Sequence, residues 1–209
     1  MPERRRIGLT MRTDSPAQYD EPRDGLARDW AEFLAFALPE LLWLPVPNLG
    51  AAAVEYAREL EIEGLILTGG ADPATDRLRD ETEEWLLREA AARALPVFGV
   101  CRGLQMLLRF LGAPSLERVP ECHIARRHQV RFLGGDSDGV VEVNSFHRYG
   151  LREERLPAAC EPLAVAEDGW VEAVRATSLP FAGAMWHPER ERPFRALDRR
   201  LIRRIFALE

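Results

Sequence analysis

The strongest indication of architecture is the segment VFGVCRGLQML at residues 97–107. An apolar run ends at Cys101, which stands between Gly99 and Gly103, and leucines at helical spacing follow it. This order predicts a strand, a sharp turn and a helix with the thiol at the corner, the cysteine counterpart of the nucleophile elbow. The small residues let the strand and the helix approach closely, and the turn strains the backbone of the nucleophile.

The same turn predicts chemistry at Cys101. The N-terminus of the following helix favours the thiolate, which is the attacking form, over the thiol. The backbone amide of Arg102 is then placed to donate to an oxyanion. The alternative is a structural cysteine before a helix, because most free cysteines are buried and inert. The flanking glycines do not separate the two interpretations by themselves.

A second segment, FAGAMWHPE at residues 181–189, is an apolar strand that ends in a histidine and a glutamate. Side chains two positions apart in an extended chain point to the same side, and Pro188 keeps His187 out of helical geometry. Glu189 can therefore orient the imidazole, as the third member of a triad does. The alternative is an exposed His-Pro turn with a solvated glutamate. Together with the elbow, the segment predicts Cys101 as nucleophile, His187 as base and acid, and Glu189 as orienting group.

A third segment, GLILTGGAD at residues 64–72, is a strand of buried type that ends in two glycines. A Gly-Gly corner after a parallel strand presents backbone amides at the carboxyl edge of the sheet, where ligands of open α/β sheets bind. Gly70 is therefore the predicted second oxyanion donor. The alternative is an ordinary strand-to-loop turn.

Composition limits the possible classes of protein. A chain of 209 residues suits one α/β domain with a buried core, so one domain over residues 1–209 is expected. The net charge of -6 argues against a general nucleic-acid-binding protein. The absence of lysine excludes a Schiff-base lysine and a P-loop lysine, and three cysteines argue against a secreted disulfide framework. The sequence has no apolar signal core and no stretch of bilayer length, so a cytoplasmic protein is expected.

Apolar patterning predicts strands that alternate with helices in the first half of the chain. The expected strands are 7–11, 41–46 and one from 64; the expected helices are 24–36, 51–60 and 82–94, with a polar loop from 12 to 22. This alternation is typical of a mainly parallel sheet with helices on both faces. The second half predicts a C-terminal antiparallel extension and a closing helix. Its expected strands are 129–132, 140–144, 163–166, 171–176 and 181–186, with turns at 134–136 and 168–169 and a helix over 193–208.

Four motifs together resemble the class I glutamine amidotransferase superfamily, and more closely its free-standing γ-glutamyl hydrolase branch. They are Thr68-Gly69-Gly70, Gly99-Val100-Cys101-Arg102-Gly103-Leu104-Gln105, Val143-Asn144-Ser145-Phe146-His147 and Trp186-His187-Pro188-Glu189. The resemblance implies a flavodoxin-like α/β fold and a Cys-His-Glu triad that cleaves γ-glutamyl bonds through a glutamyl thioester. It also implies a set of substrate-binding residues: Gly69, Gln105, Asn144, Ser145 and His147.

A narrower resemblance is to the γ-glutamyl-CDP-amidate hydrolases of this branch. It rests on Ile7-Gly8-Leu9-Thr10, Tyr19, Glu21, Arg23-Asp24, Asp29-Trp30, Asn144-Ser145-Phe146-His147 and Met185-Trp186-His187-Pro188-Glu189-Arg190-Glu191. It implies a substrate in which the γ-carbonyl of glutamate is joined to the phosphoramidate nitrogen of a cytidine diphosphate derivative. The implied products are glutamate and cytidine diphosphoramidate, in the pathway that makes phosphoramidate decorations of bacterial capsule.

The polar N-terminal stretch is the predicted site for the rest of such a substrate. Arg12 and Arg23 suit bidentate contact with a diphosphate, and Tyr19 and Trp30 suit stacking on a base. The alternative is that Trp30 belongs to the core and that the arginines are solvated.

The implied mechanism needs no cofactor and no metal. Cys122, His123 and His128 are residue types that ligate zinc. Their spacing is irregular and no fourth partner stands beside them in the sequence. We therefore interpret them as part of a loop at the surface or beside the substrate.

Other functions share the same motifs. A glutamine amidotransferase subunit would use this site to pass ammonia to a synthetase partner, and a hydrolase of γ-glutamyl amines would perform nearly the same reaction. A non-catalytic protein that binds a γ-glutamyl ligand or a partner is the third alternative, and the intact Cys-His-Glu set argues against it. The expected partner is a small-molecule γ-glutamyl substrate rather than nucleic acid or a membrane, and the oligomeric state stays open.

Overall fold

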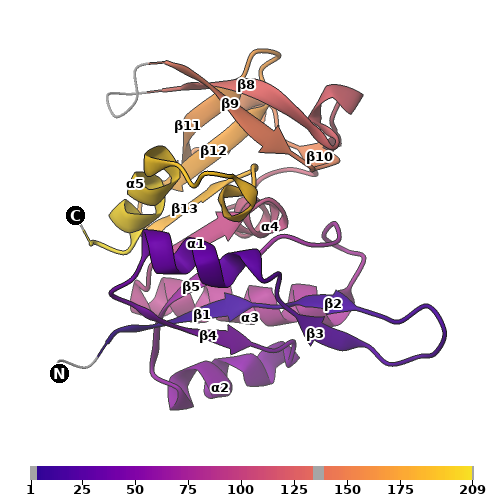
Figure 1. Cartoon of the computed structure of the whole chain (residues 1–209), viewed down its shortest axis with the longest axis vertical. Helices are drawn as coiled ribbons and strands as arrows, with labels where there is room; N and C mark the ends of the chain where they lie inside the picture. Colours follow the sequence, from indigo (N-terminus) through magenta and orange to yellow (C-terminus); the bar gives the residue numbers. More distant parts are fainter. Residues whose placement is uncertain (1–3, 134–138, 209) are drawn as a thin grey trace.

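This computed structural model describes residues 4–133 and 139–208, and its centre is a nine-stranded sheet (Figure 1). The strand order is β4-β1-β5-β6-β13-β12-β11-β8-β9. The first part of the sheet is parallel: β4 (Leu42–Val46), β1 (Arg6–Thr10), β5 (Ile62–Leu67), β6 (Val97–Val100) and β13 (Phe181–Ala184). The rest is antiparallel: β12 (Val171–Ala176), β11 (Cys160–Ala166), β8 (Arg126–Phe132) and β9 (Val140–Ser145). The predicted α/β sheet with a C-terminal antiparallel extension is confirmed.

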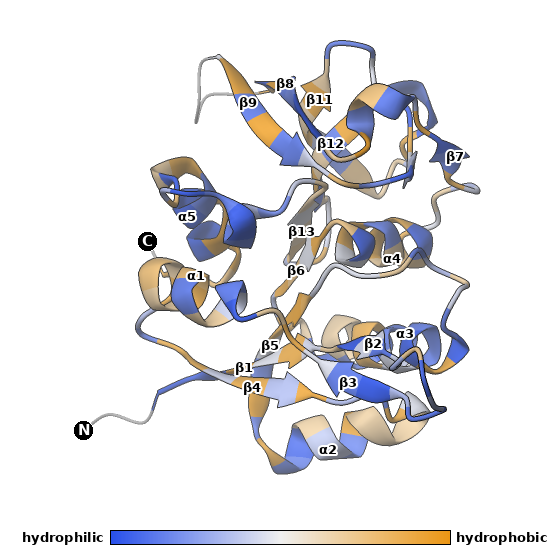
Figure 2. Ribbon diagram, turned by 45° about the vertical axis from the view of Figure 1, so that its right-hand side comes forward, coloured by the Kyte–Doolittle hydropathy of each residue, from blue (hydrophilic) through white to orange (hydrophobic). Residues whose placement is uncertain are grey.

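Helices cover both faces of the sheet, as Figure 2 shows. One face carries α1 (Asp29–Ala37) and α5 (Ala196–Ile205); the other carries α2 (Ala53–Glu59), α3 (Arg77–Arg93) and α4 (Arg102–Phe110). Successive side chains of β6 point to opposite faces of the sheet. Phe98 belongs to the core under α1 and α5, and Val97 belongs to the core under α3 and α4. No helix in the described ranges combines the length and apolar composition needed to cross a membrane.

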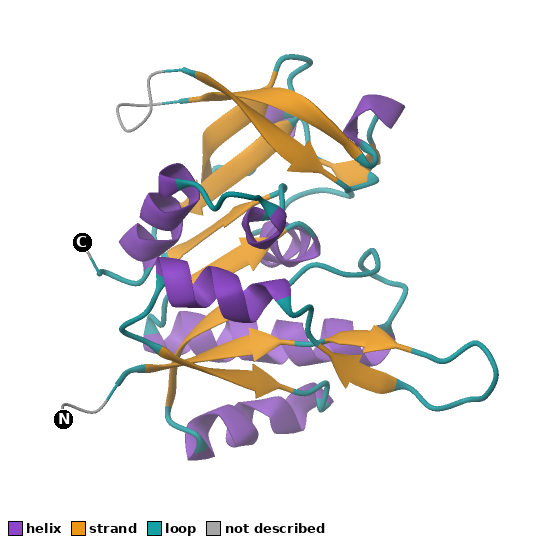
Figure 3. Ribbon diagram, viewed as in Figure 1, coloured by secondary structure: helices purple, strands orange, loops and turns teal. Residues whose placement is uncertain are grey.

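Short elements connect these layers (Figure 3). Two small strand pairs lie outside the main sheet: β2 (Arg12–Asp14) with β3 (Arg23–Gly25), and β7 (Glu117–Arg118) with β10 (Tyr149–Gly150). Short 3-10 turns are η1 (Gly50–Ala52), η2 (Glu121–His123), η3 (Glu153–Arg155) and η4 (Pro188–Arg190).

The structure corrects several predicted boundaries. The segment expected to be a helix from residue 24 begins as strand β3, and α1 starts only at Asp29. The polar loop from residue 12 in fact contains β2, which pairs with β3 as a hairpin. Helix α3 begins five residues before the predicted start at 82 because the Asp76 side chain accepts a hydrogen bond from the Arg79 amide and caps it. The predicted turn at 134–136 lies outside the described residues.

The parallel part of the sheet places the predicted motifs at one edge. Strands β5, β6 and β13 are neighbours and run in the same direction, so their carboxyl ends meet. Gly69 and Gly70 follow β5, Cys101 follows β6, and His187 follows β13. Segments more than a hundred residues apart in sequence therefore converge at the edge where open α/β sheets bind ligands.

Candidate active site

Cys101 occupies a strained corner between β6 and α4. Its φ of 52° lies in the region that L-residues rarely adopt, as the elbow predicts. Its amide donates to the Ala184 carbonyl of β13 at 2.8 Å, which ties the corner to the strand that leads to His187. A Cβ on Gly103 would lie 2.0 Å from the Leu67 carbonyl oxygen, so only glycine permits this approach of helix and sheet. The backbone amide of Arg102 lies in the first turn of α4, where helix amides have no intrahelical acceptor.

His187 and Glu189 form a buried pair beside this corner. The two atoms His187 Nδ1 and Glu189 Oε1 are 2.7 Å apart, and both residues are 2% exposed. Burial alone would lower the pKa of His187, but the interaction with the Cys101 side chain, together with Glu189, raises it to about 9. The structure therefore brings together the three residues of the predicted triad and favours a protonated imidazole beside the Cys101 sulfur.

Asn144 holds the backbone of His187 by two hydrogen bonds. The amide of His187 donates to Asn144 Oδ1 at 2.9 Å, and Asn144 Nδ2 donates to the His187 carbonyl at 2.8 Å. Asn144 Nδ2 also donates to Glu191 Oε1 at 2.6 Å. The side chain predicted to bind substrate is thus engaged in positioning the histidine.

The glycine corner after β5 packs directly on this histidine. A Cβ on Gly69 would lie 2.6 Å from Cε1 of His187, so a larger residue would displace the ring. Arg79, which is buried, donates to the carbonyl of Gly69 at 3.1 Å and to that of Thr68 at 2.8 Å. Because the C=O and N–H of a trans peptide point in opposite directions, this anchoring turns the amide of Gly70 away from Arg79.

A buried arginine–glutamate cluster underlies the elbow and the glycine corner; it consists of Arg79, Asp80, Glu83 and Arg102. Glu83 accepts from Arg79 Nε at 3.2 Å, from the Thr10 hydroxyl at 2.8 Å and from Arg102, which also pairs with Asp80. Burial alone would raise the pKa of Glu83, but the guanidinium groups of Arg102 and Arg79 lower it. Sequence reasoning missed this cluster, although the i, i+4 spacing of Arg79 and Glu83 was a visible signal.

The other residues predicted to bind the glutamyl group have protein partners. Gln105 Nε2 donates to the Tyr149 carbonyl at 2.8 Å, whereas Gln105 Oε1 is buried without a partner in the described part of the chain. The Ser145 hydroxyl donates to the His123 carbonyl. His147 contacts Tyr149 and Glu172. Substrate contact by these residues stays a prediction.

The residues predicted to bind the diphosphate and base separate into two groups. Arg12 and Trp30 line a small pocket that also contains Gly69 and Gly70, and Trp30 is 3% exposed within the core, as the alternative interpretation proposed. Arg23 lies farther along the hairpin, where it pairs with Glu21 at 2.7 Å and donates to the exposed Tyr19 hydroxyl at 2.8 Å. The structure brings Arg12 to the site and does not bring Arg23 there.

Cys122, His123 and His128, which the sequence predicts to be part of a loop at the surface or beside the substrate, lie in different environments. Cys122 is exposed, whereas His123 is buried and His128 is partly exposed. Both rings turn toward Glu172, which His147 also contacts. These four residues form the histidine–glutamate cluster and span fifty positions of the sequence: His123, His128, His147 and Glu172.

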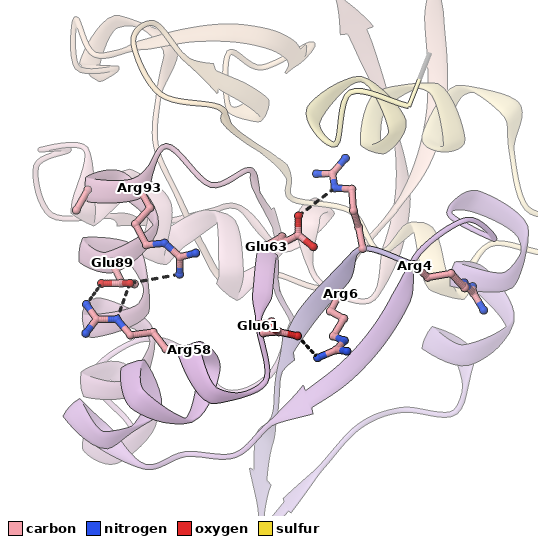
Figure 4. A pocket seen from close by; sticks show the side chains of 9 residues that line it. Arg4, Arg6, Arg58, Glu61, Glu63, Glu89 and Arg93 are labelled. Atoms are coloured by element: carbon pink, nitrogen blue, oxygen red, sulfur yellow. Dashed lines mark hydrogen bonds and ion pairs between the residues drawn. The ribbon is translucent and has the colours of Figure 1, made fainter. Parts of the chain in front are cut away.

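Pockets occur at both ends of the strands. One of about 850 Å³ is lined by charged residues at the start of β1 and β5 and the ends of α2 and α3, the edge away from Cys101 (Figure 4). Most of its arginines pair with its glutamates, as in the 2.7 Å contact of Arg58 with Glu89, whereas Arg4 donates to backbone carbonyls. Another, of about 710 Å³, lies beside the β2–β3 hairpin at the carboxyl edge and is lined in part by Thr13, Asp24, Ala71 and Arg79. This second pocket is next to the Gly69-Gly70 corner and has the volume of a small-molecule site.

Comparisons with known proteins agree with this arrangement. Residues 7–189 match the family model described as Peptidase C26. The chain is 30% identical over 193 residues to the gamma-glutamyl-CDP-amidate hydrolase of Campylobacter jejuni subsp. jejuni, covering 88% of this chain and 90% of that relative. It is 31% identical over 192 residues to the gamma-glutamyl-gamma-aminobutyrate hydrolase of Escherichia coli O157:H7, covering 80% and 75%. The crystal structure of a glutamine amidotransferase from Thermotoga maritima has a TM-score of 0.66 at 14% identity, covers 99% of this chain and 84% of its own, and shares the fold.

Proposed function

Since the chain belongs to the Peptidase C26 family, which confirms its resemblance to γ-glutamyl hydrolases, we propose that it cleaves a γ-glutamyl C–N bond with a cysteine nucleophile. The two γ-glutamyl hydrolase relatives support this reaction class. The relative that aligns over 90% of its length supports γ-glutamyl-CDP-amidate as the substrate. The products are glutamate and cytidine diphosphoramidate. The proposal treats residues 1–209 as one hydrolase domain, because one sheet joins strands from both halves of the chain.

The observation that carries the proposal is the meeting of a cysteine at positive φ with a buried His-Glu pair. Cys101 is at the N-terminus of α4, which stabilises a thiolate. His187, with its pKa raised to about 9, stores the proton that the leaving group needs. Glu189 keeps the ring oriented through its 2.7 Å contact with Nδ1.

In the first half of the reaction, the Cys101 thiolate attacks the γ-carbonyl of the substrate and forms a tetrahedral oxyanion. The amides of Gly70 and Arg102 donate to this oxyanion, a contribution of about 3 kcal/mol for each donor. The intermediate collapses as the C–N bond breaks and His187 transfers its proton to the leaving nitrogen. Cytidine diphosphoramidate departs, and a glutamyl thioester on Cys101 remains.

In the second half, His187 takes a proton from a water molecule that attacks the thioester. The thiolate of Cys101 leaves, glutamate is released, and His187 is again protonated. The net change is the addition of one water across the C–N bond, and no cofactor takes part. Arg79 acts as a positioning residue, because it anchors the carbonyl of Gly69 and so orients the amide of Gly70.

The two ends of the substrate have separate candidate contacts. The unpartnered, buried Gln105 Oε1 is an acceptor available to the α-ammonium of the glutamyl group. Arg12 and the 710 Å³ pocket beside the β2–β3 hairpin are the proposed contacts of the leaving group, because both adjoin the Gly69-Gly70 corner. Arg12→Ala is expected to raise KM for the nucleotide substrate and to spare L-glutamine.

The deciding experiment measures glutamate release from γ-glutamyl-CDP-amidate and from L-glutamine in parallel, with Cys101→Ala as the blank. Strong preference for the nucleotide substrate is the expected result. Near-normal release by Cys101→Ala or by His187→Ala would overturn the mechanism. Activity on L-glutamine alone would overturn the substrate assignment.

The second candidate function is that of an amidotransferase subunit. Helix α3 leaves two large apolar side chains, Leu78 and Trp85, 50% and 43% exposed, and a synthetase partner could cover them. Such a subunit would release little glutamate without its partner. Full activity of the isolated chain on γ-glutamyl-CDP-amidate would exclude this role.

A further inference from the structure

The histidine–glutamate cluster lies outside the machinery proposed for catalysis. Oε1 of Glu172 is 3.3 Å from His123 Nδ1, 3.4 Å from His128 Nε2 and 3.2 Å from His147 Nε2. The side chains of Glu172 and His147 are fully buried, that of His123 is 1% exposed and that of His128 is 12% exposed. The donor atoms of His123, His147 and Glu172 all lie within 4.8 Å of one another.

The remaining contacts of two histidines determine where their protons are. Nε2 of His123 faces Asp168 Oδ2 at 3.0 Å, and Nδ1 of His147 faces the Tyr149 carbonyl at 3.2 Å. A carboxylate and a carbonyl only accept hydrogen bonds, so these two nitrogens carry the hydrogen. In a neutral ring the other nitrogen then has a lone pair. Both lone pairs, on His123 Nδ1 and His147 Nε2, point at the same carboxylate oxygen.

Protons alone satisfy this arrangement poorly. A neutral Glu172 could donate one hydrogen, to one nitrogen only. If one ring alone is protonated, it donates to Glu172 Oε1, but the lone pair of the other ring still faces the same oxygen. Protonation of both rings would place two cations with centroids 5.2 Å apart in the interior, and His128 would be a third ionisable ring at 4.5 Å from His123. His123 Nδ1, both nitrogens of His128 and Glu172 Oε2 are buried without hydrogen-bond partners among the described residues.

The geometry points to a structural site for one divalent transition-metal ion, of which Zn²⁺ is the best match, ligated by His123 Nδ1, His147 Nε2 and the Glu172 carboxylate. An imidazole–carboxylate donor set is typical of zinc. In a tetrahedral site with bonds of 2.0–2.1 Å, neighbouring ligand atoms are about 3.3 Å apart. The oxygen-to-nitrogen separations of 3.2 and 3.3 Å in the cluster agree with that value. His128 Nε2 is the nearest side-chain atom for the fourth position, at 3.4 Å from the same oxygen.

The surroundings of the cluster are those of a metal centre. Metal-bound histidines donate their second ring N–H to a carboxylate or a carbonyl, which sets the tautomer. Asp168 and the Tyr149 carbonyl are in these positions for His123 and His147. Trp170, which is buried, packs its ring 6.3 Å from that of His123 and shields that side of the cluster.

The ion would join four segments of the antiparallel part of the chain. Glu172 belongs to β12, His128 to β8, His123 to η2, and His147 to the loop between β9 and β10. The preceding residue of that loop, Phe146, places its ring 5.6 Å from His187. Binding of the ion therefore stabilises the antiparallel part of the sheet and fixes the wall beside the base, whereas the nucleophile belongs to the parallel part.

The test uses the whole chain and Zn²⁺ or Co²⁺ alone. The protein is stripped with a chelator, dialysed and titrated with each ion, and bound metal is measured by elemental analysis. We expect one equivalent of Zn²⁺ per chain and a rise in Tm of about 5–10 °C at a hundredfold excess of free ion over Kd. Co²⁺ is expected to give the intense visible absorption of a tetrahedral site.

Variants locate the site. Glu172→Gln and His147→Gln are expected to lose the bound equivalent, the Tm rise and the Co²⁺ absorption. Cys122→Ala is the matched control, because Cys122, His123 and Asp168 form an alternative group of donor atoms closer to the surface. Cys122→Ala is expected to keep all three signals.

Two results would overturn the site. One is a folded wild-type chain that binds less than a tenth of an equivalent of Zn²⁺ and Co²⁺ and shows no Tm change. The other is a bound ion that persists in Glu172→Gln or is lost in Cys122→Ala. Because the wild-type titration needs no variant, the proposal remains testable even if Glu172→Gln does not fold. Neither readout depends on hydrolase activity, so failure of the metal site and failure of the proposed function are distinguishable.

Discussion

Two buried clusters of ionisable side chains flank the candidate active site, and they satisfy their polar atoms differently. In the arginine–glutamate cluster, Glu83 accepts from Arg79, Arg102 and the Thr10 hydroxyl, so donors and acceptors match. In the histidine–glutamate cluster, two imidazole lone pairs face one oxygen of Glu172. The first cluster is complete with protein atoms alone, whereas the cation that we propose would complete the second.

The clusters also support opposite sides of the chemistry. The arginine–glutamate cluster anchors the carbonyls of Thr68 and Gly69 and lies under the elbow, so it supports the proposed nucleophile and oxyanion site. The histidine–glutamate cluster lies behind the loop that places Phe146 against His187, so it supports the proposed base. This division follows the sheet, because the first cluster lies on helices α3 and α4 that pack on its parallel part, and the second lies in its antiparallel part and the adjoining loops.

The largest expected effect is on kcat, at Cys101, which lies between the parts of the site that the two clusters support. Cys101→Ala is expected to lower kcat for glutamate release by about 10⁴-fold or more, because the nucleophile is lost. Cys160→Ala is the control, since Cys160 is also a buried free cysteine and lies in β11, away from the elbow. Similar losses in both variants would mean that the effect comes from packing and not from chemistry.

Glu83→Gln tests whether the buried charges of the arginine–glutamate cluster are paired by protein atoms alone. Removal of the charge leaves two buried guanidinium groups without a carboxylate at that position, so the free energy of unfolding is expected to fall by about 3–5 kcal/mol. Urea unfolding measures this loss, which should be the same with Zn²⁺ and with a chelator. The control is the exposed Glu84→Gln on the same helix, with an expected change within about 0.5 kcal/mol. A loss at Glu83 that depends on Zn²⁺ would contradict the distinction between the clusters.

The link from the antiparallel part to the base is tested at Asn144. Asn144→Ala removes both hydrogen bonds to the His187 backbone and is expected to lower kcat about 10- to 100-fold with little change in KM. Asn144→Asp keeps the acceptor for the His187 amide but places a carboxylate oxygen against Glu191 and the His187 carbonyl, so kcat is expected to stay low in this variant as well. A rise in KM with unchanged kcat would instead favour the substrate contact that the family resemblance implies for Asn144.

The smallest expected effect is on the pH dependence of the free energy of unfolding, which depends on the groups that surround His187. Burial would lower its pKa, but Cys101 and Glu189 raise it to about 9, above the ordinary 6.5. The stabilisation is therefore complete below pH 6.5 and is lost as the pH rises through about 9. Cys101→Ala removes the larger raising contribution, so the loss of stability over this range should shrink by about 1–2 kcal/mol.

This pH dependence is measured by NMR titration of the His187 ring and by urea unfolding at both ends of the range. Glu189→Gln serves as the comparison and is expected to lower the pKa of His187 by less than Cys101→Ala does. An unchanged pKa in Cys101→Ala would show that the thiol and the imidazole do not interact.

Much of the site was predictable because its signals are local. The strand, the turn and the helix around Cys101 follow from apolar spacing and two glycines, and the His-Pro-Glu motif needs only the period of an extended chain. The hairpin of β2 and β3 was missed because three-residue strands carry almost no periodicity. Arg79 and Glu83 were missed as buried residues, because an arginine and a glutamate on a helix ordinarily indicate a solvent face.

The local order of the chain was sufficient to predict which residues could react: the cysteine at a glycine-flanked corner, the histidine and glutamate after an apolar strand, and the parallel sheet that carries them. Their meeting depends on strand order, since β13 lies beside β6 although the four antiparallel strands of the sheet stand between them in the sequence. The same holds for His123, His128, His147 and Glu172, which lie on four segments with no common period. Sequence periodicity reports which face a residue takes within one element, whereas distances between elements depend on the packing of the whole sheet.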